Sequence, residues 1–223
     1  MVDVASNLKQ VLADLPEGVR LVAVSKFHPV SELMEAYAAG QRVFGESHVQ
    51  ELQQKVAVMP DDVEWHFIGH LQTNKVKYLA PYVTMIHAVD SVKLLREINR
   101  QAEKHGRVID VLLELHIAEE ETKYGFSIDD CRAMVAGGEW RQLNHVRICG
   151  LMMMASYTDD TEQIRREMQQ ALDLFRELKR DYFAADDTFA LRSWGMSHDY
   201  RIAVETGSTM VRVGTTIFGE REY

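Results

Sequence analysis

The chain has 223 residues, of which 46% are hydrophobic, so it can bury a sizeable core within one large domain. Its formal net charge of −9 argues against non-specific nucleic-acid binding, although a local basic pocket could still bind phosphate. The two cysteines, Cys131 and Cys149, lack the CxxC spacing of a zinc site or redox motif, and no apolar run approaches the length of a membrane span. We therefore expect a soluble, cytoplasmic protein without a signal peptide.

Short apolar runs rich in β-branched residues alternate along the chain with longer amphipathic runs. In chain order the pattern predicts a helix at 4–15, a strand at 19–26, a helix at 30–39, a strand at 42–45, a helix at 49–58, a strand at 64–68, a helix at 73–80 and a strand at 83–89. It continues with a helix to about 105, a strand at 108–117, a helix at 128–136, a strand at 146–153, a helix at 161–182, a strand at 188–193, a helix at 200–205, a strand at 210–213 and a final turn through 218.

Eight strands that alternate with helices predict parallel pairing and right-handed crossovers. The fold class that fits this pattern and length is α/β, as a single (β/α)8 TIM barrel, and the alternative is an open doubly wound sheet. No linker rich in Pro, Gly or Ser divides the chain, so residues 1–223 are expected to form one domain.

In a barrel of this kind, functional residues gather at the carboxyl ends of the strands. Lys26 ends the first predicted strand, Leu-Val-Ala-Val-Ser-Lys, where a buried strand has no need of a charge. Such a lysine is either a solvated charge on the rim or a nucleophile. Burial would favour the neutral amine, which can form a Schiff base with an aldehyde.

Two glycine-containing loops follow the seventh and eighth predicted strands. One carries Met196 and Ser197, and the other carries Gly214 and Thr215. Each loop alone is typical of a helix cap, but the pair lies where barrels often bind phosphate. A ligand with both an aldehyde and a phosphate would unite these loops with Lys26, and pyridoxal 5′-phosphate is such a ligand.

Arg212 lies two residues before Gly214, on the same inward face of the eighth strand. It is either half of a salt bridge, with Glu46 or Glu205 as candidates, or the donor to the pyridine nitrogen of the cofactor. In the second case the nitrogen stays unprotonated, because arginine can only donate, and the ring is a weak electron sink.

Two histidines, His66 and His70, are spaced four residues apart, but the strand context and Gly69 argue against a metal pair. His66 is interpreted as a core residue or as part of the cofactor wall. We expect no metal site.

These residues resemble the YggS/PROSC family of pyridoxal phosphate homeostasis proteins in order and over nearly the whole chain. The matching stretches are residues 23–26, 44–46, 49–51, 65–69, 71–72, 74–75, 123–125, 150–152, 195–197, 207–209 and 217–220, with Asp199, Arg212 and Gly214. The resemblance implies a barrel similar to the N-terminal domain of alanine racemase and to that of eukaryotic ornithine decarboxylase.

By this resemblance, Lys26 holds pyridoxal phosphate as an internal aldimine, Ser197, Gly214 and Thr215 bind its phosphate, and Arg212 faces the pyridine nitrogen. Met196, His66 and Ser47 complete the expected cofactor site. The family commonly has Asn-Tyr where this chain has Ser47-His48, which leaves the asparagine contact to the cofactor in doubt here.

The family is regarded as keeping vitamin B6 and amino-acid pools in balance, with no established catalytic activity. We therefore expect a cytoplasmic, monomeric carrier whose partners are pyridoxal phosphate, small amino acids and apo enzymes that receive the cofactor. The alternatives are a slow amino-acid racemase and a cofactor-free lyase of aldolase type. Racemases of this fold add a β domain that supplies an opposite-face acid, which the chain lacks up to Tyr223. Tyr124 or His66 are the candidates for that role.

Overall fold

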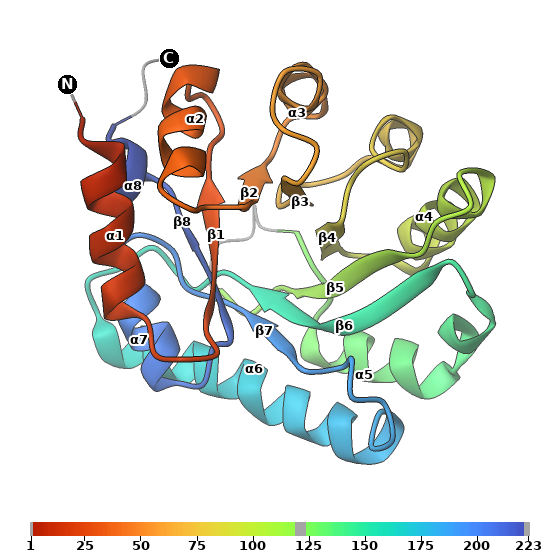
Figure 1. The fold of residues 1–223 in the computed structure, drawn as a ribbon. Coiled ribbons are helices and arrows are strands. Elements are labelled where there is room, and N and C mark those ends of the chain that lie inside the picture. Colours follow the sequence, from red (N-terminus) through yellow and green to blue (C-terminus); the bar gives the residue numbers. More distant parts are fainter. Residues whose placement is uncertain (1, 119–123, 221–223) are drawn as a thin grey trace.

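The computed structural model describes residues 2–118 and 124–220 and forms a closed barrel of eight parallel strands in sequential order (Figure 1). The strands are β1 (Arg20–Val24), β2 (Val43–Glu46), β3 (Glu64–Phe67), β4 (Met85–Val89), β5 (Ile109–Leu115), β6 (Val146–Met153), β7 (Leu191–Ser193) and β8 (Met210–Val213). The barrel closes where β8 pairs with β1, with Val22 opposite Arg212. The predicted TIM barrel is confirmed, and the doubly wound alternative is wrong because an open sheet has no such pairing.

Helices surround the barrel on its outer side (Figure 1). They are α1 (Val4–Asp14), α2 (Val30–Ala38), α3 (Val49–Val56), η1 (Thr73–Tyr78), α4 (Val92–Lys104), α5 (Ile128–Gly137), η2 (Glu139–Gln142), α6 (Thr161–Tyr182), α7 (Tyr200–Glu205) and α8 (Thr215–Phe218). α1 precedes the first strand and lies beside α8, to which Asn7 donates a hydrogen bond at the Ile217 carbonyl. In the described part of the chain, none of these helices has both the length and the apolar character that crossing a bilayer requires.

Local sequence explains where several helices begin and end. The Ser91 hydroxyl accepts from the Leu94 N–H at the start of α4, and Asp160 caps α6 in the same way at Gln163. α5 ends at Gly138, whose φ of 71° lies in the left-handed region that favours glycine. These caps satisfy backbone groups that a helix end otherwise leaves without a partner.

Some predicted elements differ from those observed. Residues 73–78 form a 3₁₀ helix instead of an α-helix, and η2 is an additional short element. β7 has three residues because the stretch before it turns: Asp186 accepts from both the N–H and the hydroxyl of Thr188. The predicted motif residue Lys123 lies outside the described residues.

The barrel interior holds an apolar cluster of Val22, Met85, Ala88, Leu112, Cys149, Met152 and Met210. Polar side chains lie next to this cluster toward the carboxyl ends of the strands. Arg212 follows Met210 by two residues on β8, and Glu114 follows Leu112 on β5. Functional residues of such barrels gather at this end.

Candidate functional site

A cavity of about 400 Å³ opens at the carboxyl ends of the strands, a volume typical of small-molecule sites. The residues that line it are Val24, Lys26, Ser47, Ile68, Gly69, His70, Glu114, Tyr124, Met154, Tyr157, Met196, Ser197, His198, Arg212, Gly214 and Thr215. Every residue predicted for the cofactor site is in this wall except His66. Residues up to 191 positions apart in the sequence are thus brought into one cavity, from 24 to 215.

Lys26 lies two residues after the end of β1 and belongs to a tight turn, in which the His28 N–H donates to the Ser25 carbonyl at 3.1 Å. Val24, at the end of β1, lines the same cavity. The sequence allowed Lys26 to be a solvated charge on the rim. In the structure it instead lies in the cavity wall, between the barrel interior and the loop after β8.

The loops after β7 and β8 meet at the cavity. The Ser197 hydroxyl accepts from the Gly214 N–H at 3.1 Å, and the Asp199 carboxylate accepts from the Met196 N–H at 2.5 Å. Neither α7 nor α8 has a side-chain cap, so Ser197 and Thr215 do not serve as helix caps. Both residues instead line the cavity, together with Gly214. Such a set of neutral donors can bind the oxygens of a phosphate.

At position 214 a glycine is favoured because the backbone of the loop after β8 lies close to Val24. A Cβ atom there would lie 3.0 Å from the Val24 carbonyl oxygen and 3.2 Å from the Val24 Cβ. The loop after β8 therefore packs directly on the end of β1. This contact brings Gly214 and Thr215 next to the turn that carries Lys26.

Arg212 is buried and held by neutral acceptors. Its Nη1 donates to the Ser193 carbonyl and hydroxyl, both at 2.6 Å, and its Nη2 donates to the Met153 carbonyl at 3.0 Å. Burial lowers the pKa of Arg212 to about 10, while the charges of Asp199 and Glu114 oppose this shift. The guanidinium therefore stays charged near neutral pH and is fixed in the cavity wall.

The salt-bridge alternative for Arg212 is wrong. Glu46 pairs with Lys55, at 2.7 Å, and Glu205 pairs with Arg165 on the surface. Glu46 is the last residue of β2, and its hydrogen bonds to Lys55 and Ser25 tie it to α3 and to the end of β1. Since the charge of Arg212 is not neutralised by a direct carboxylate contact among the described ion pairs, it is available to a ligand.

His66 lies inside the barrel and does not reach the cavity. Its Nδ1 is 2.9 Å from His87 Nε2, and His87 Nδ1 is 3.1 Å from the Ser193 hydroxyl, which also accepts from Arg212. We call His66, His87, Ser193 and Arg212 the histidine chain. Burial lowers the pKa of His66 to about 3 and that of His87 well below its usual value, so both rings are neutral.

The described residues contain no group of three or more His, Cys, Asp or Glu side chains placed to hold a metal ion. His66 and His70 also lie in different surroundings. His66 is buried against His87, whereas His70 stacks on the Tyr124 ring at 3.6 Å between centroids and lies 3.3 Å from Asp90. These two histidines do not form a pair.

Glu114 is a titratable group in the cavity wall that the sequence reading missed. It is 3% exposed, and one of its carboxyl oxygens has no hydrogen-bond partner. Its pKa is raised to about 7, mainly by burial and also by the charge of Asp90, while the charge of Arg212 opposes this shift. A buried oxygen without a partner beside a cavity fits a site that a polar ligand completes. The signal was a glutamate within the apolar run Val-Leu-Leu-Glu-Leu of the fifth strand.

Aromatic side chains and Ser47 form the outer rim of the cavity. Tyr124 stacks on His70, and Tyr157 meets His198 edge to face at 5.2 Å between centroids. Ser47 Oγ lies 3.3 Å from His48 Nδ1. A flat, apolar ring could pack within this rim while its polar substituents reach the loops.

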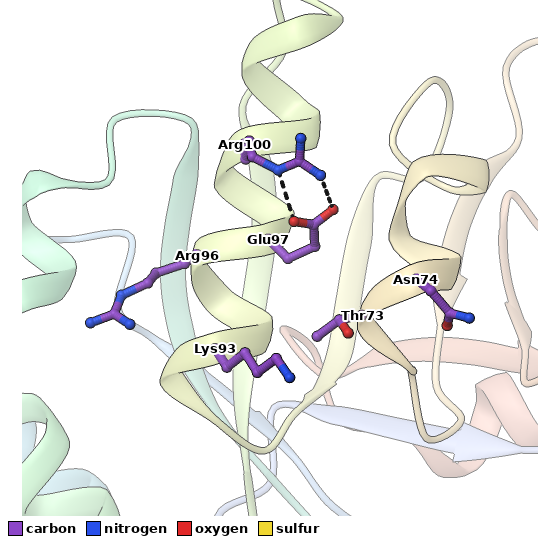
Figure 2. Close-up of a pocket in the computed structure, with 6 residues that line it drawn as sticks. All are labelled: Thr73, Asn74, Lys93, Arg96, Glu97 and Arg100. Carbon is purple, nitrogen blue, oxygen red and sulfur yellow. Dashed lines mark hydrogen bonds and ion pairs between the residues drawn. The ribbon is translucent and has the colours of Figure 1, made fainter.

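A second hollow lies on the outside of the barrel, between η1 and α4 (Figure 2). Arg100 and Glu97 pair with each other within α4, and Arg96 points away from η1 toward its partner Glu139 (Figure 2). The charges of these arginines are thus compensated within the protein, and Thr73, Asn74 and Lys93 are the other residues that line the hollow. The cavity at the barrel mouth is the better candidate.

The chain is similar in sequence to proteins of a known family. The sequence model described as alanine racemase, N-terminal domain, matches residues 2–222. A protein of Aquifex aeolicus named pyridoxal phosphate homeostasis protein is 41% identical over 206 residues, which are 92% of this chain and 88% of that protein.

Solved structures are similar as well. PipY of Synechococcus elongatus PCC7942, solved with pyridoxal phosphate bound, superposes with a TM-score of 0.86 at 35% identity, covering 97% of this chain and all of that one. The alanine racemase of Clostridium difficile 630 superposes with a TM-score of 0.76 over 99% of this chain and 57% of that one; at 14% identity it shows the shared fold alone.

Proposed function

This chain belongs to the pyridoxal phosphate homeostasis protein family, within the alanine racemase N-terminal domain family, and on this premise we propose that it holds the cofactor covalently on Lys26. Its ligand is pyridoxal 5′-phosphate, and its role lies in the homeostasis of that cofactor. We further propose that this role is storage and delivery, without robust catalysis.

One observation carries the proposal: an amine, a set of phosphate-type donors and a fixed cation line the same cavity. The amine is Lys26, the donors are Ser197 and Thr215 with the backbone of Gly214, and the cation is Arg212. When bound, the cofactor supplies an aldehyde, and the Lys26 amine adds to it with loss of water to form a Schiff base. The loops after β7 and β8 would hold the phosphate and orient the aldehyde toward Lys26.

The environment of Arg212 favours a protein that binds the cofactor over an enzyme that turns over amino acids. Its position and charge are fixed by Ser193 and Met153, and an arginine can donate to the pyridine nitrogen but cannot protonate it at neutral pH. An unprotonated ring withdraws fewer electrons from an attached amino acid. A bound amino acid would therefore lose its α-proton slowly.

The proposal is tested by borohydride reduction of protein supplied with pyridoxal phosphate, followed by peptide mass mapping. The expected adduct is on Lys26. The Lys26→Ala variant should lose the Schiff-base absorbance and retain weak binding through the phosphate loops. A variant that keeps this absorbance, or an adduct on another lysine only, would show that the assignment is wrong.

A second candidate function, slow racemisation of small amino acids, is favoured by the place of Tyr124. This phenol lines the same cavity as Lys26. Racemisation needs one acid/base group on each face of the substrate. Incubating the loaded protein with an enantiopure amino acid and measuring the opposite enantiomer tests this function, with Tyr124→Phe as the variant that should abolish it. His66, the other candidate, is walled off from the cavity.

We propose delivery to apo enzymes as the use of the stored cofactor. The cavity mouth supports this, because Tyr157 at its rim is 83% exposed. Both cysteines are free and buried, which fits the reducing cytoplasm as the compartment. Mixing the loaded protein with an apo enzyme, with and without a scavenger of free cofactor, separates direct transfer from release. Sedimentation of the loaded protein tests the expected monomer.

A further inference from the structure

A buried charge network lies behind the turn that carries Lys26. The Lys55 ammonium donates to the Glu46 carboxylate, the Glu51 carboxylate and the Ser25 carbonyl, each at 2.7 Å. Glu46 also accepts from the Ser25 hydroxyl at 2.6 Å, and Glu51 accepts from the Phe27 N–H at 2.6 Å. We call Glu46, Lys55 and Glu51 the Lys55 network.

The network lies on the outer side of the barrel wall. Lys55 and Glu51 come from α3, while Glu46 ends β2 on the same face as Phe44, which packs in the core between strands and helices. The side chains of Glu46 and Lys55 are 0% and 5% exposed. None of the three lines the cavity at the barrel mouth, so a role in the site must act through the turn.

The network makes hydrogen bonds to the residues on both sides of Lys26. Ser25, before the lysine, is held at its carbonyl and its hydroxyl, and Phe27, after it, is held at its N–H. Phe27 has a φ of 68°, the single positive φ of a non-glycine residue in the described chain. A bulky residue in this region costs free energy and persists only where its surroundings hold it.

We propose that the Lys55 network is a positioning device that aims Lys26 into the cavity for attack on the bound aldehyde. The proposal rests on the proposed function, because it takes Lys26 as the nucleophile. The network holds the turn at the two residues next to Lys26, and Lys26 itself lines the cavity.

A purely stabilising role accounts for these contacts less well. Buried ion pairs are often no better for stability than apolar residues of similar size, since burying each charge is costly. Here three charged groups are brought together, and the second oxygen of Glu46 has no partner. The atoms that they hold are those of the two residues next to Lys26, which is the arrangement that positioning requires.

The test separates Schiff-base formation from cofactor affinity. The variants are Lys55→Met and Glu51→Ala, and the ligands are pyridoxal phosphate and pyridoxine phosphate, which has the same ring and phosphate but no aldehyde. Schiff-base formation, followed by absorbance and by the borohydride-trapped adduct, should slow by about 10- to 100-fold, as for a misplaced reacting group. Affinity for pyridoxine phosphate should stay within about twofold of the parent, since the phosphate loops are untouched.

The matched control is Arg107→Met. Arg107 also holds a loop carbonyl, that of Ala80 at 2.7 Å, but both residues precede their strands, at the opposite end of the barrel. This variant should form the Schiff base at the parent rate. The conservative Lys55→Arg variant keeps a cation at the network and should recover part of the rate.

The following results would overturn the positioning role of the Lys55 network. Folded Lys55→Met and Glu51→Ala proteins that react at the parent rate would overturn the proposal. An equal loss of affinity for pyridoxine phosphate would do the same, because it would indicate general disorder of the site. If Lys55→Met does not fold, Glu51→Ala decides, since Glu51 is partly exposed and holds Phe27 directly. A parent protein without an adduct on Lys26 would instead refute the proposed function.

Discussion

The molecule buries a cation in two ways, on the two sides of the barrel wall. In the Lys55 network, outside the wall, the ammonium is surrounded by two carboxylates. In the histidine chain, inside it, Arg212 is held by neutral acceptors and neighbours two uncharged imidazoles. The first charge is neutralised by its partners and can only hold the chain in place. In the described part of the chain, the charge of Arg212 is not neutralised by a direct partner, so it can interact with a ligand.

The largest effect on stability is expected when the Lys55 network loses its cation. Lys55→Met leaves the buried Glu46 carboxylate without its counter-charge, so the free energy of unfolding should fall by about 3–5 kcal/mol. Urea denaturation of the apo protein measures this loss. The double variant Lys55→Met, Glu46→Gln should recover part of it, because the uncompensated charge is removed as well. A loss below about 1 kcal/mol would mean that the network is solvated, contrary to the structure.

The next prediction concerns Glu114, a buried carboxyl that makes no direct ion pair among the described residues. The folded-state pKa is about 7 against an ordinary value of 4.5, so the folded protein binds more protons between these values. Its stability therefore falls as pH rises through this window, and Glu114→Gln should be more stable than the parent by about 3 kcal/mol at about pH 8. The gain should vanish near pH 3, where glutamate is neutral in both the folded and the unfolded chain. An equal difference at both pH values would contradict the assignment.

The next effect concerns the neutral rings of the histidine chain. The pKa of His66 is about 3 in the fold against an ordinary 6.5, so the unfolded chain binds more protons below pH 6.5. Stability is fully present above this value and is lost as pH falls, by about 2 kcal/mol for His66 at about pH 5. His66→Gln should flatten this part of the pH profile. The exposed-rim variant His198→Gln serves as a control and should leave the slope as in the parent.

The smallest change in stability is expected at Arg212. Arg212→Gln loses hydrogen bonds but also relieves the burial of a charge, so the free energy of unfolding should fall by only about 1–2 kcal/mol. Cofactor affinity should fall more clearly, by about 10- to 100-fold, because a charge-assisted donor is lost. Denaturation and cofactor titration on the same variant measure the two effects. A loss of stability as large as that of Lys55→Met would show that the two cations are held alike.

Much of the fold could be predicted because it depends on local pattern. The apolar runs gave β6 and β8 with the observed bounds, and the amphipathic run gave α6 likewise. The alternation of strand and helix implied the parallel barrel. β7 was predicted too long, since the turn at Asp186 ends the extended run through a side-chain hydrogen bond that apolar pattern does not encode.

The site could be predicted in part for the same reason. Residues next to strand ends, such as Lys26, Ser197 and Gly214, share the barrel mouth once the fold is known. For His66 the sequence left a core residue and a cofactor-wall residue as alternatives, because a strand pattern shows that a residue faces inward but not which side chains surround it. In the structure His66 is buried and contacts His87, 21 residues away.

The sequence by itself determined the barrel and the residues that lie near the end of each strand, because these follow from hydrophobic period and chain order. Only the tertiary structure decided which of them are partners. Electrostatic and hydrogen-bond energies depend on distance and burial, and both are set when strands and helices far apart in the chain pack together. Lys55 reads as an ordinary helix-surface lysine in the sequence; it holds the neighbours of Lys26 because α3 packs against the ends of β1 and β2.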